Sequence, residues 1–229
     1  MHRRRFVGST LAASVALFNL RTAAAAGAGE LVPLPKRKRV KVAFMLGEHA
    51  NVIDTMGPWE VFQDAVTPEG DDASFELFTV APAEGLLEMT GGLQVQPKYT
   101  IANAPQPNVI VVPAQRSTAE SRAWLKQASA GTDVTMSVCT GAFQLARAGL
   151  LGGVMATTHH EFFDSFAREF PDIELRRGLR FVDSGRIATA GGLTSGIDLA
   201  LRVVARYHGA EAAQATAAYM EYASDAWRA

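Results

Sequence analysis

Short apolar runs alternate along the chain with segments whose apolar residues recur at helical spacing. The runs contain no internal turn residue and predict buried strands at residues 40–46, 75–80, 108–113, 133–138 and 155–158. The segments between them predict helices. One begins at Gly57-Pro58, and five others cover residues 117–129, 141–151, 159–170, 195–207 and 211–223. Ser184-Gly185 separates residues 180–183 from 186–190 and predicts a pair of adjoining strands. Strands that alternate with helices favour an α/β fold with a mostly parallel sheet.

The first 28 residues have the order of an export signal. Arg3, Arg4 and Arg5 precede an apolar run over residues 6–20, and a tract of small residues follows at 22–29. Arg3-Arg4, followed by Phe6-Val7, resembles a twin-arginine motif. The apolar run is shorter than the ~20 residues that span a bilayer. The sequence therefore predicts a twin-arginine signal peptide over residues 1–28, periplasmic localisation, and no stable membrane insertion after cleavage. The alternative is a frayed basic start followed by an alanine-rich helix.

Composition bounds the rest of the chain. Residues 29–39 contain Pro33, Pro35 and a run of four basic residues, and predict a solvated linker ahead of a single domain at 40–229. Without the four arginines of the signal, 18 basic residues face 23 acidic ones, so the remainder carries a net charge near −5. That balance gives no electrostatic footprint for nucleic acid. The single cysteine, Cys139, excludes an intramolecular disulfide and a cysteine-rich metal site.

Cys139 is the main candidate for chemistry. It ends an apolar strand, and small residues flank it at Ser137 and Gly141, as a sharp strand-to-helix turn requires. In such a nucleophile elbow, the free N–H groups and the dipole of the following helix favour thiolate over thiol. The carboxyl end of a strand in an open parallel sheet is also where ligands bind. The alternative is that Cys139 is a small buried apolar residue.

The first strand-to-helix connection offers a partner for that sulfur. If the first strand and the strand before Cys139 are neighbours, Asp54 lies near the sulfur, where burial would raise its pKa and fit it to move a proton. The alternative is that Asp54 caps the following helix. His159 and His160 suggest a Cys–His pair or a metal, but no third metal ligand has suitable spacing. A remoter alternative is a hydrolase triad of Cys139, Asp183 and His208.

Motifs occurring in order carry a family resemblance: Asp54–Phe62, Ser137–Phe143, Ala156–His159 and Ala190–Asp198. Together they resemble the DJ-1/PfpI superfamily, within it the branch of isonitrile hydratases and of the ligand-sensing domains of AraC-type regulators. The resemblance spans roughly residues 40–223. It implies a flavodoxin-like three-layer α/β sandwich, a homodimer, a small-molecule substrate and no cofactor or metal.

The resemblance also implies roles for individual residues. Cys139 matches the nucleophile, Asp54 the acid that hydrogen-bonds it, and Thr140 the next position, where the peptidase-like branch carries a histidine base that is absent here. Cys139 would attack the isonitrile carbon, Asp54 would protonate the resulting adduct to a thioimidate, and water would release an N-substituted formamide. The implied substrate contacts are Gly57, Ala114, Gln115, Gly141, His159 and Gly192.

Two departures from the family pattern leave other functions open. Relatives often carry two glycines where this chain has Ala114-Gln115, which changes the pocket beside the thiol. The export signal is the second departure, since relatives are mostly cytosolic. The alternatives are a non-catalytic ligand-sensing module and a redox protein in which Cys139 oxidises to sulfinate.

Overall fold

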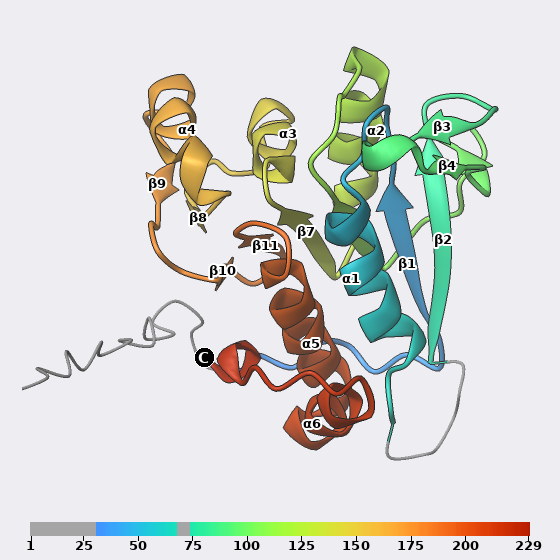
Figure 1. Ribbon diagram of the computed structural model, residues 1–229, viewed down its shortest axis with the longest axis vertical. Coiled ribbons are helices and arrows are strands. Elements are labelled where there is room, and N and C mark those ends of the chain that lie inside the picture. The colour runs from blue at the N-terminus through green and yellow to red at the C-terminus, as the bar shows by residue number, and fades with distance from the viewer. Residues whose placement is uncertain (1–30, 68–73) are drawn as a thin grey trace, which may run out of the picture.

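A seven-stranded sheet forms the centre of the computed structural model, which describes residues 31–67 and 74–229 (Figure 1). The strands in spatial order are β10 (Phe181–Asp183), β11 (Ile187–Ala190), β7 (Val134–Val138), β6 (Val109–Val112), β1 (Val40–Met45), β2 (Phe75–Ala81) and β5 (Tyr99–Thr100). All pairs are parallel except β10 with β11, the pair predicted around Ser184-Gly185. The run β2-β1-β6-β7-β11 is the flavodoxin-like order.

Helices cover both faces of the sheet and complete the predicted three layers (Figure 1). Successive residues of β1 alternate between the faces, so Val42 and Phe44 join one core and Ala43 and Met45 the other. The first core is completed by α1 (Val52–Gln63), α5 (Ser195–His208) and α6 (Ala210–Tyr219). The second is completed by α2 (Ala119–Ser129), α3 (Gly141–Arg147) and α4 (Phe163–Glu169).

Short elements lie outside the seven-stranded sheet. The antiparallel pair β3 (Leu87–Glu88) and β4 (Gln94–Val95) encloses the 3-10 turn η1 (Thr90–Gly92), none of which the apolar pattern predicts. A separate parallel pair joins β8 (Met155–Ala156) to β9 (Glu174–Leu175). The remaining 3-10 turns are η2 (His160–Phe162) and η3 (Ala226–Arg228).

Several predicted helix boundaries are wrong for local reasons. Helix α1 begins at Val52 rather than at Gly57-Pro58, because the Asn51 side chain caps it by accepting from the N–H of Asp54 at 3.2 Å. Asp54 therefore lies in the first turn and is not the cap. Helix α3 ends at Arg147, since Gly149 takes φ +75° well before the predicted Gly152-Gly153 stop. The predicted helix 159–170 opens instead as the turn η2.

Residues 31–39 form an extended strap that crosses α5 before entering β1. The N–H of Leu34 donates to the carbonyl of Arg206 at 2.8 Å, and Arg206 Nε donates to the carbonyl of Val32 at 3.0 Å. Arg37 forms a bidentate pair with Asp133 at 2.6 and 2.8 Å. The predicted signal peptide, residues 1–28, lies outside the described residues. Within residues 31–67 and 74–229, no helix combines the length and apolar character of a membrane span.

Candidate active site

Cys139 occupies a strained turn between β7 and α3. Its backbone has φ +58°, a conformation that costs a non-glycine residue about 1–3 kcal/mol and persists only where neighbours enforce it. Here its N–H donates to the carbonyl of Gly191 at 2.7 Å, and its own carbonyl accepts from Thr158 Oγ1 at 2.9 Å. The helix then starts against β6, where a Cβ on Gly141 would lie 2.1 Å from the carbonyl oxygen of Val112. Only glycine fits this approach, as the small-residue pattern predicted.

Asp54 is fully buried beside the Cys139 thiol, on the first turn of α1. Its Oδ2 atom accepts from the N–H of Ala114 at 3.1 Å. Its Oδ1 atom is buried and has no hydrogen bond of good geometry among the described residues. The Cys139 thiol and the N–H of Leu193 nevertheless lie near enough to the carboxyl group to lower the pKa of Asp54. The acid and the sulfur therefore share one enclosed site.

The strand packing that places Asp54 beside the sulfur differs from the expectation that β1 and β7 are neighbours. Strands β1 and β7 are not neighbours, because β6 lies between them. The carboxyl end of β6 supplies Ala114, whose N–H binds Asp54 and whose carbonyl accepts from Asn51 at 2.8 Å. Residues that follow three adjacent strands thus meet at one edge of the sheet.

The electrostatics of the pair reverse one expectation. Burial raises the pKa of Asp54 to about 6, against the lowering effects of the N–H groups of Ala114 and Leu193 and of the Cys139 thiol. Burial, together with the Asp54 charge, raises the pKa of Cys139 to about 12. The backbone and hydroxyl of Thr140 lower it, as expected from a helix start, but by less. The upward shift of the thiol pKa opposes the thiolate that a helix start favours, and the two shifts together favour a neutral thiol beside a carboxylate at neutral pH.

The Ala114-Gln115 segment has a packing role. The Gln115 side-chain amide accepts from the N–H of Gly47 and donates to the carbonyl of Met45 at 2.7 Å, so both of its ends bind the chain at the carboxyl end of β1. Gln144 of α3 donates to the carbonyl of Gln115 at 3.4 Å. These contacts fix the position of the Ala114 N–H that Asp54 accepts.

Two of the other expected substrate contacts line a cleft, and one does not. His159 is half-buried against Gly192, where a Cβ would lie 2.1 Å from its ring, and it stacks on His160 with ring centroids 4.4 Å apart. Gly57 is buried in α1, where a Cβ would lie 3.0 Å from Ile197 of α5, so its visible role is helix packing. The cleft has a volume of about 350 Å³ and is lined by Thr158–His160, Phe163, Gly178–Arg180 and Gly191–Ser195.

The alternative triad is wrong. Asp183 pairs with Arg202 at 3.3 Å and Arg206 at 3.0 Å. His208 packs on Phe75, the first residue of β2, at the sheet edge opposite to Cys139. Within the described part of the chain, no group of three His, Cys, Asp or Glu side chains is placed to hold a metal ion.

Thr158, Gly191 and Leu193 escaped the sequence analysis as site residues. Each was visible in a motif, but the hydrogen bond of Thr158 to Cys139 depends on how the segment after β8 returns to the sheet. Leu193 has φ +53°, a left-handed conformation that a leucine in the sequence does not predict.

Comparison with known proteins identifies related sequences over most of the chain. The model of the DJ-1/PfpI family matches residues 40–206. The chain is 28% identical over 190 residues to an isonitrile hydratase from Pseudomonas putida, covering 80% of this chain and 79% of the relative. It is also 28% identical over 185 residues to the HTH-type transcriptional regulator GbdR of Pseudomonas aeruginosa. That match covers 79% of this chain but spans only half the length of the regulator.

Solved structures show the same architecture. A THiJ/PfpI family protein from Pseudomonas syringae superposes with a TM-score of 0.73 at 26% identity, covering 84% of this chain and 78% of that one. DJ-1 from Toxoplasma gondii, at 22% identity, shares the fold with a TM-score of 0.66 over 81% of this chain and all of its own.

Proposed function

The chain belongs to the DJ-1/PfpI family, and on that premise we propose that it is a cysteine-dependent hydratase that converts an isonitrile into an N-substituted formamide. The observation that carries the proposal is the buried Asp54 carboxyl group beside the only thiol of the chain. Similarity to an isonitrile hydratase over 80% of the chain supports the same reaction class.

The first step forms the carbon–sulfur bond. Asp54, ionised above about pH 6, takes the proton of the Cys139 thiol while the sulfur attacks the terminal isonitrile carbon. The same proton then passes from Asp54 to that carbon, which gives a thioimidate, R–N=CH–S–Cys139. The sulfur needs no resting negative charge in this sequence, because its deprotonation accompanies the attack.

Water completes the reaction without any other reagent. It adds to the thioimidate carbon, and its proton reaches the nitrogen through Asp54. The carbon–sulfur bond then breaks, the hydroxyl oxygen becomes the formamide carbonyl, and its proton returns to the sulfur through Asp54. The balance is one isonitrile and one water to one N-substituted formamide, with Cys139 regenerated.

The test is turnover of para-nitrophenyl isocyanide, followed by formation of the formamide. Wild type should form product catalytically, and Cys139→Ala should fall to the buffer rate. Ser137→Ala is the matched control, because Ser137 is also buried in the same motif and its hydroxyl has no partner among the described residues. Equal rates for wild type, Cys139→Ala and buffer would reject the proposal.

A ligand-sensing module is the second candidate. It is favoured by the match to half the length of GbdR. The Gln115 side chain also favours it, because its amide binds the end of β1 in place of the glycine that hydratase relatives often carry there. A sensor would bind small molecules in the cleft with the same affinity in wild type and Cys139→Ala, without turnover. Calorimetric titration with the isocyanide and the formamide separates it from the hydratase.

The proposal extends to location and assembly. The order of residues 1–28 supports periplasmic export by the twin-arginine route, and the family resemblance supports a homodimer. Replacing Arg3 and Arg4 by lysine should trap a fusion reporter in the cytoplasm if the first holds. Light scattering of the mature chain should give twice the monomer mass if the second holds.

A further inference from the structure

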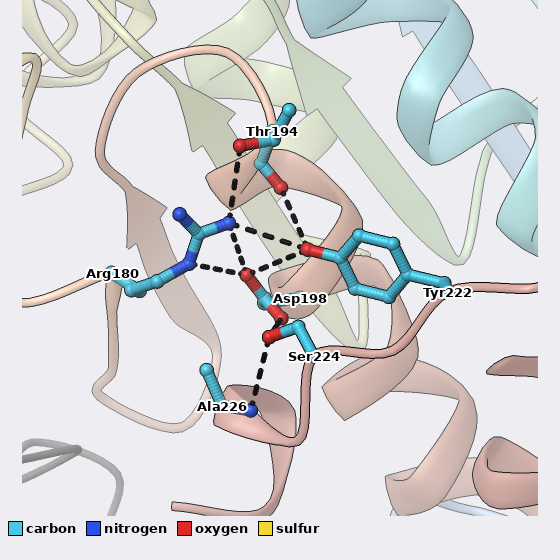
Figure 2. A network of polar contacts seen from close by, with 6 residues as sticks. All are labelled: Arg180, Thr194, Asp198, Tyr222, Ser224 and Ala226. Atoms are coloured by element: carbon cyan, nitrogen blue, oxygen red, sulfur yellow. Dashed lines mark hydrogen bonds and ion pairs between the residues drawn. The ribbon is translucent and has the colours of Figure 1, made fainter. Parts of the chain in front are cut away.

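A buried acid, Asp198, organises the wall of the cleft beside the active site. It lies on the first turn of α5, has no exposed surface, and receives bonds from both sides (Figure 2). Its Oδ2 atom accepts from the Arg180 guanidinium and from the Tyr222 hydroxyl at 3.1 Å, and its Oδ1 atom accepts from Ser224 Oγ at 2.8 Å. The network thus joins α5, the residue before β10 and the chain after α6.

Arg180 bonds to both ends of the loop that follows β11. Its backbone carbonyl accepts from the N–H of Gly191 at 2.8 Å, which prolongs the β10–β11 ladder. Its Nη2 atom donates to Thr194 Oγ1 at 3.3 Å, and the Tyr222 hydroxyl bonds both Nη2 at 3.3 Å and the Thr194 carbonyl at 3.5 Å. Figure 2 shows these groups converging below the loop. The loop between Gly191 and Thr194 is therefore held at both ends by one residue, through the Arg180 backbone at Gly191 and through its side chain at Thr194.

A hydrogen bond then joins this loop to the backbone of Cys139. The carbonyl of Gly191 accepts from the N–H of Cys139 at 2.7 Å, so Arg180, Gly191 and Cys139 form a continuous chain of bonds. Leu193, inside the same loop, directs its N–H toward Asp54. Both members of the reacting pair thus depend on a loop whose position the Asp198 network sets.

We infer that Asp198 and Tyr222 are positioning residues for the active site, which hold Arg180 and the 191–194 loop so that Cys139 keeps its strained backbone and its sulfur stays enclosed beside Asp54. The inference rests on the proposed function only for its turnover readout. A purely architectural role, tying the C-terminal segment to α5, would affect stability and leave the reactivity of the sulfur unchanged.

Loosening the loop has opposite effects on two measurements. The sulfur gains access to water and leaves the Asp54 charge, so its reaction with iodoacetamide extends to lower pH. The alignment of sulfur and acid is lost at the same time, so kcat falls by about tenfold while KM changes little. Because the chain has one cysteine, alkylation followed by intact mass reports on Cys139 alone.

The experiment compares Tyr222→Phe and Asp198→Asn with two matched controls in the folded, full-length protein. Tyr219→Phe removes a hydroxyl from an exposed tyrosine of α6, and Glu169→Gln removes the acid of the exposed Arg147–Glu169 pair. We expect both network variants to lower the midpoint of the pH–alkylation curve by at least about half a pH unit, with Asp198→Asn lowering it more. The controls should follow wild type.

The outcomes separate this inference from the hydratase proposal. If wild type turns over no isonitrile, the hydratase proposal fails, and the alkylation curves still test the positioning role. If Asp198→Asn does not fold, Tyr222→Phe decides alone, since it removes one hydroxyl. Alkylation midpoints in the folded variants that equal or exceed that of wild type would overturn the inference.

Discussion

Thr158 holds the carbonyl of Cys139 with a 2.9 Å hydrogen bond from its side-chain hydroxyl, and this bond keeps the strained turn from relaxing. Together with the Gly191 carbonyl on the cysteine N–H, it fixes the backbone on both sides of the sulfur. The Cys139 sulfur is therefore positioned by backbone partners as well as by its side-chain environment.

Replacing Thr158 by valine should destabilise the protein by about 1–2 kcal/mol, because the buried Cys139 carbonyl loses its partner. Thr157→Val is the matched control, since the Thr157 hydroxyl is buried without a partner in the described structure and its loss should be neutral or stabilising. Urea unfolding measures both variants. Equal destabilisation by the two substitutions would show that the bond to Cys139 has no special role.

Asp54→Asn should stabilise the protein at pH 7. Burial raises the folded pKa of Asp54 from 3.8 to about 6, so its favourable protonated state is complete below pH 3.8 and is lost as the pH rises through 6. At neutral pH, the ionised acid thus costs up to about 3 kcal/mol, which asparagine avoids. The gain in unfolding free energy should shrink toward zero near pH 4. A gain that is the same at pH 4 and pH 7 would contradict the assignment.

The same ionisation should shape the pH dependence of turnover. Because the carboxylate must accept the thiol proton, kcat/KM should rise with pH to a plateau with a midpoint near 6, the pKa of Asp54 in the free protein. No second rise from thiol ionisation should occur below pH 9, since the pKa of Cys139 lies near 12. Rates that track a midpoint near 8.5 would instead indicate a free thiolate as the resting nucleophile.

Gly141→Ala should cost more than about 3 kcal/mol or abolish folding, because its Cβ would lie 2.1 Å from a backbone carbonyl that cannot move aside. Gly152→Ala is the control: a Cβ there meets no atom within 4 Å, and the substitution should be close to neutral. Thermal unfolding of both proteins provides the comparison. A folded Gly141→Ala with the stability of wild type would exclude this close approach.

Mild peroxide at pH 7 should leave Cys139 largely unmodified, because a neutral buried thiol oxidises slowly. Asp54→Asn should oxidise faster, since removing the carboxylate charge lowers the pKa of the thiol. Intact mass over time follows the added oxygens. Rapid formation of the sulfinate in wild type would favour the redox alternative.

The sequence determines the sheet and the turn at Cys139 because both depend on local patterns. Apolar runs mark the parallel strands, and small residues at Ser137 and Gly141 mark a turn with no space for side chains. The resting charge of the sulfur is not local, because it follows from burial and from an acid on another element. The position of Cys139 before a helix therefore does not by itself determine the charge of its thiol.

Long-range polar networks are similarly hard to predict. Asp198 lies among apolar residues of a buried helix, and this is the one signal that it has a specific partner. Its partners Arg180, Tyr222 and Ser224 lie 18 to 26 residues away on separate segments. Only the packing of α5 against β10 and against the segment after α6 brings them together.

The strap can dock only after α5 has been synthesised, because its hydrogen-bond partner lies on that helix. Val32 and Arg206, which bond to each other, lie 174 residues apart. During synthesis, the first segment therefore has to wait for nearly the entire chain to leave the ribosome before its anchor exists. A product truncated ahead of α5 would leave that segment unattached and apolar residues such as Leu34 open to proteases and chaperones.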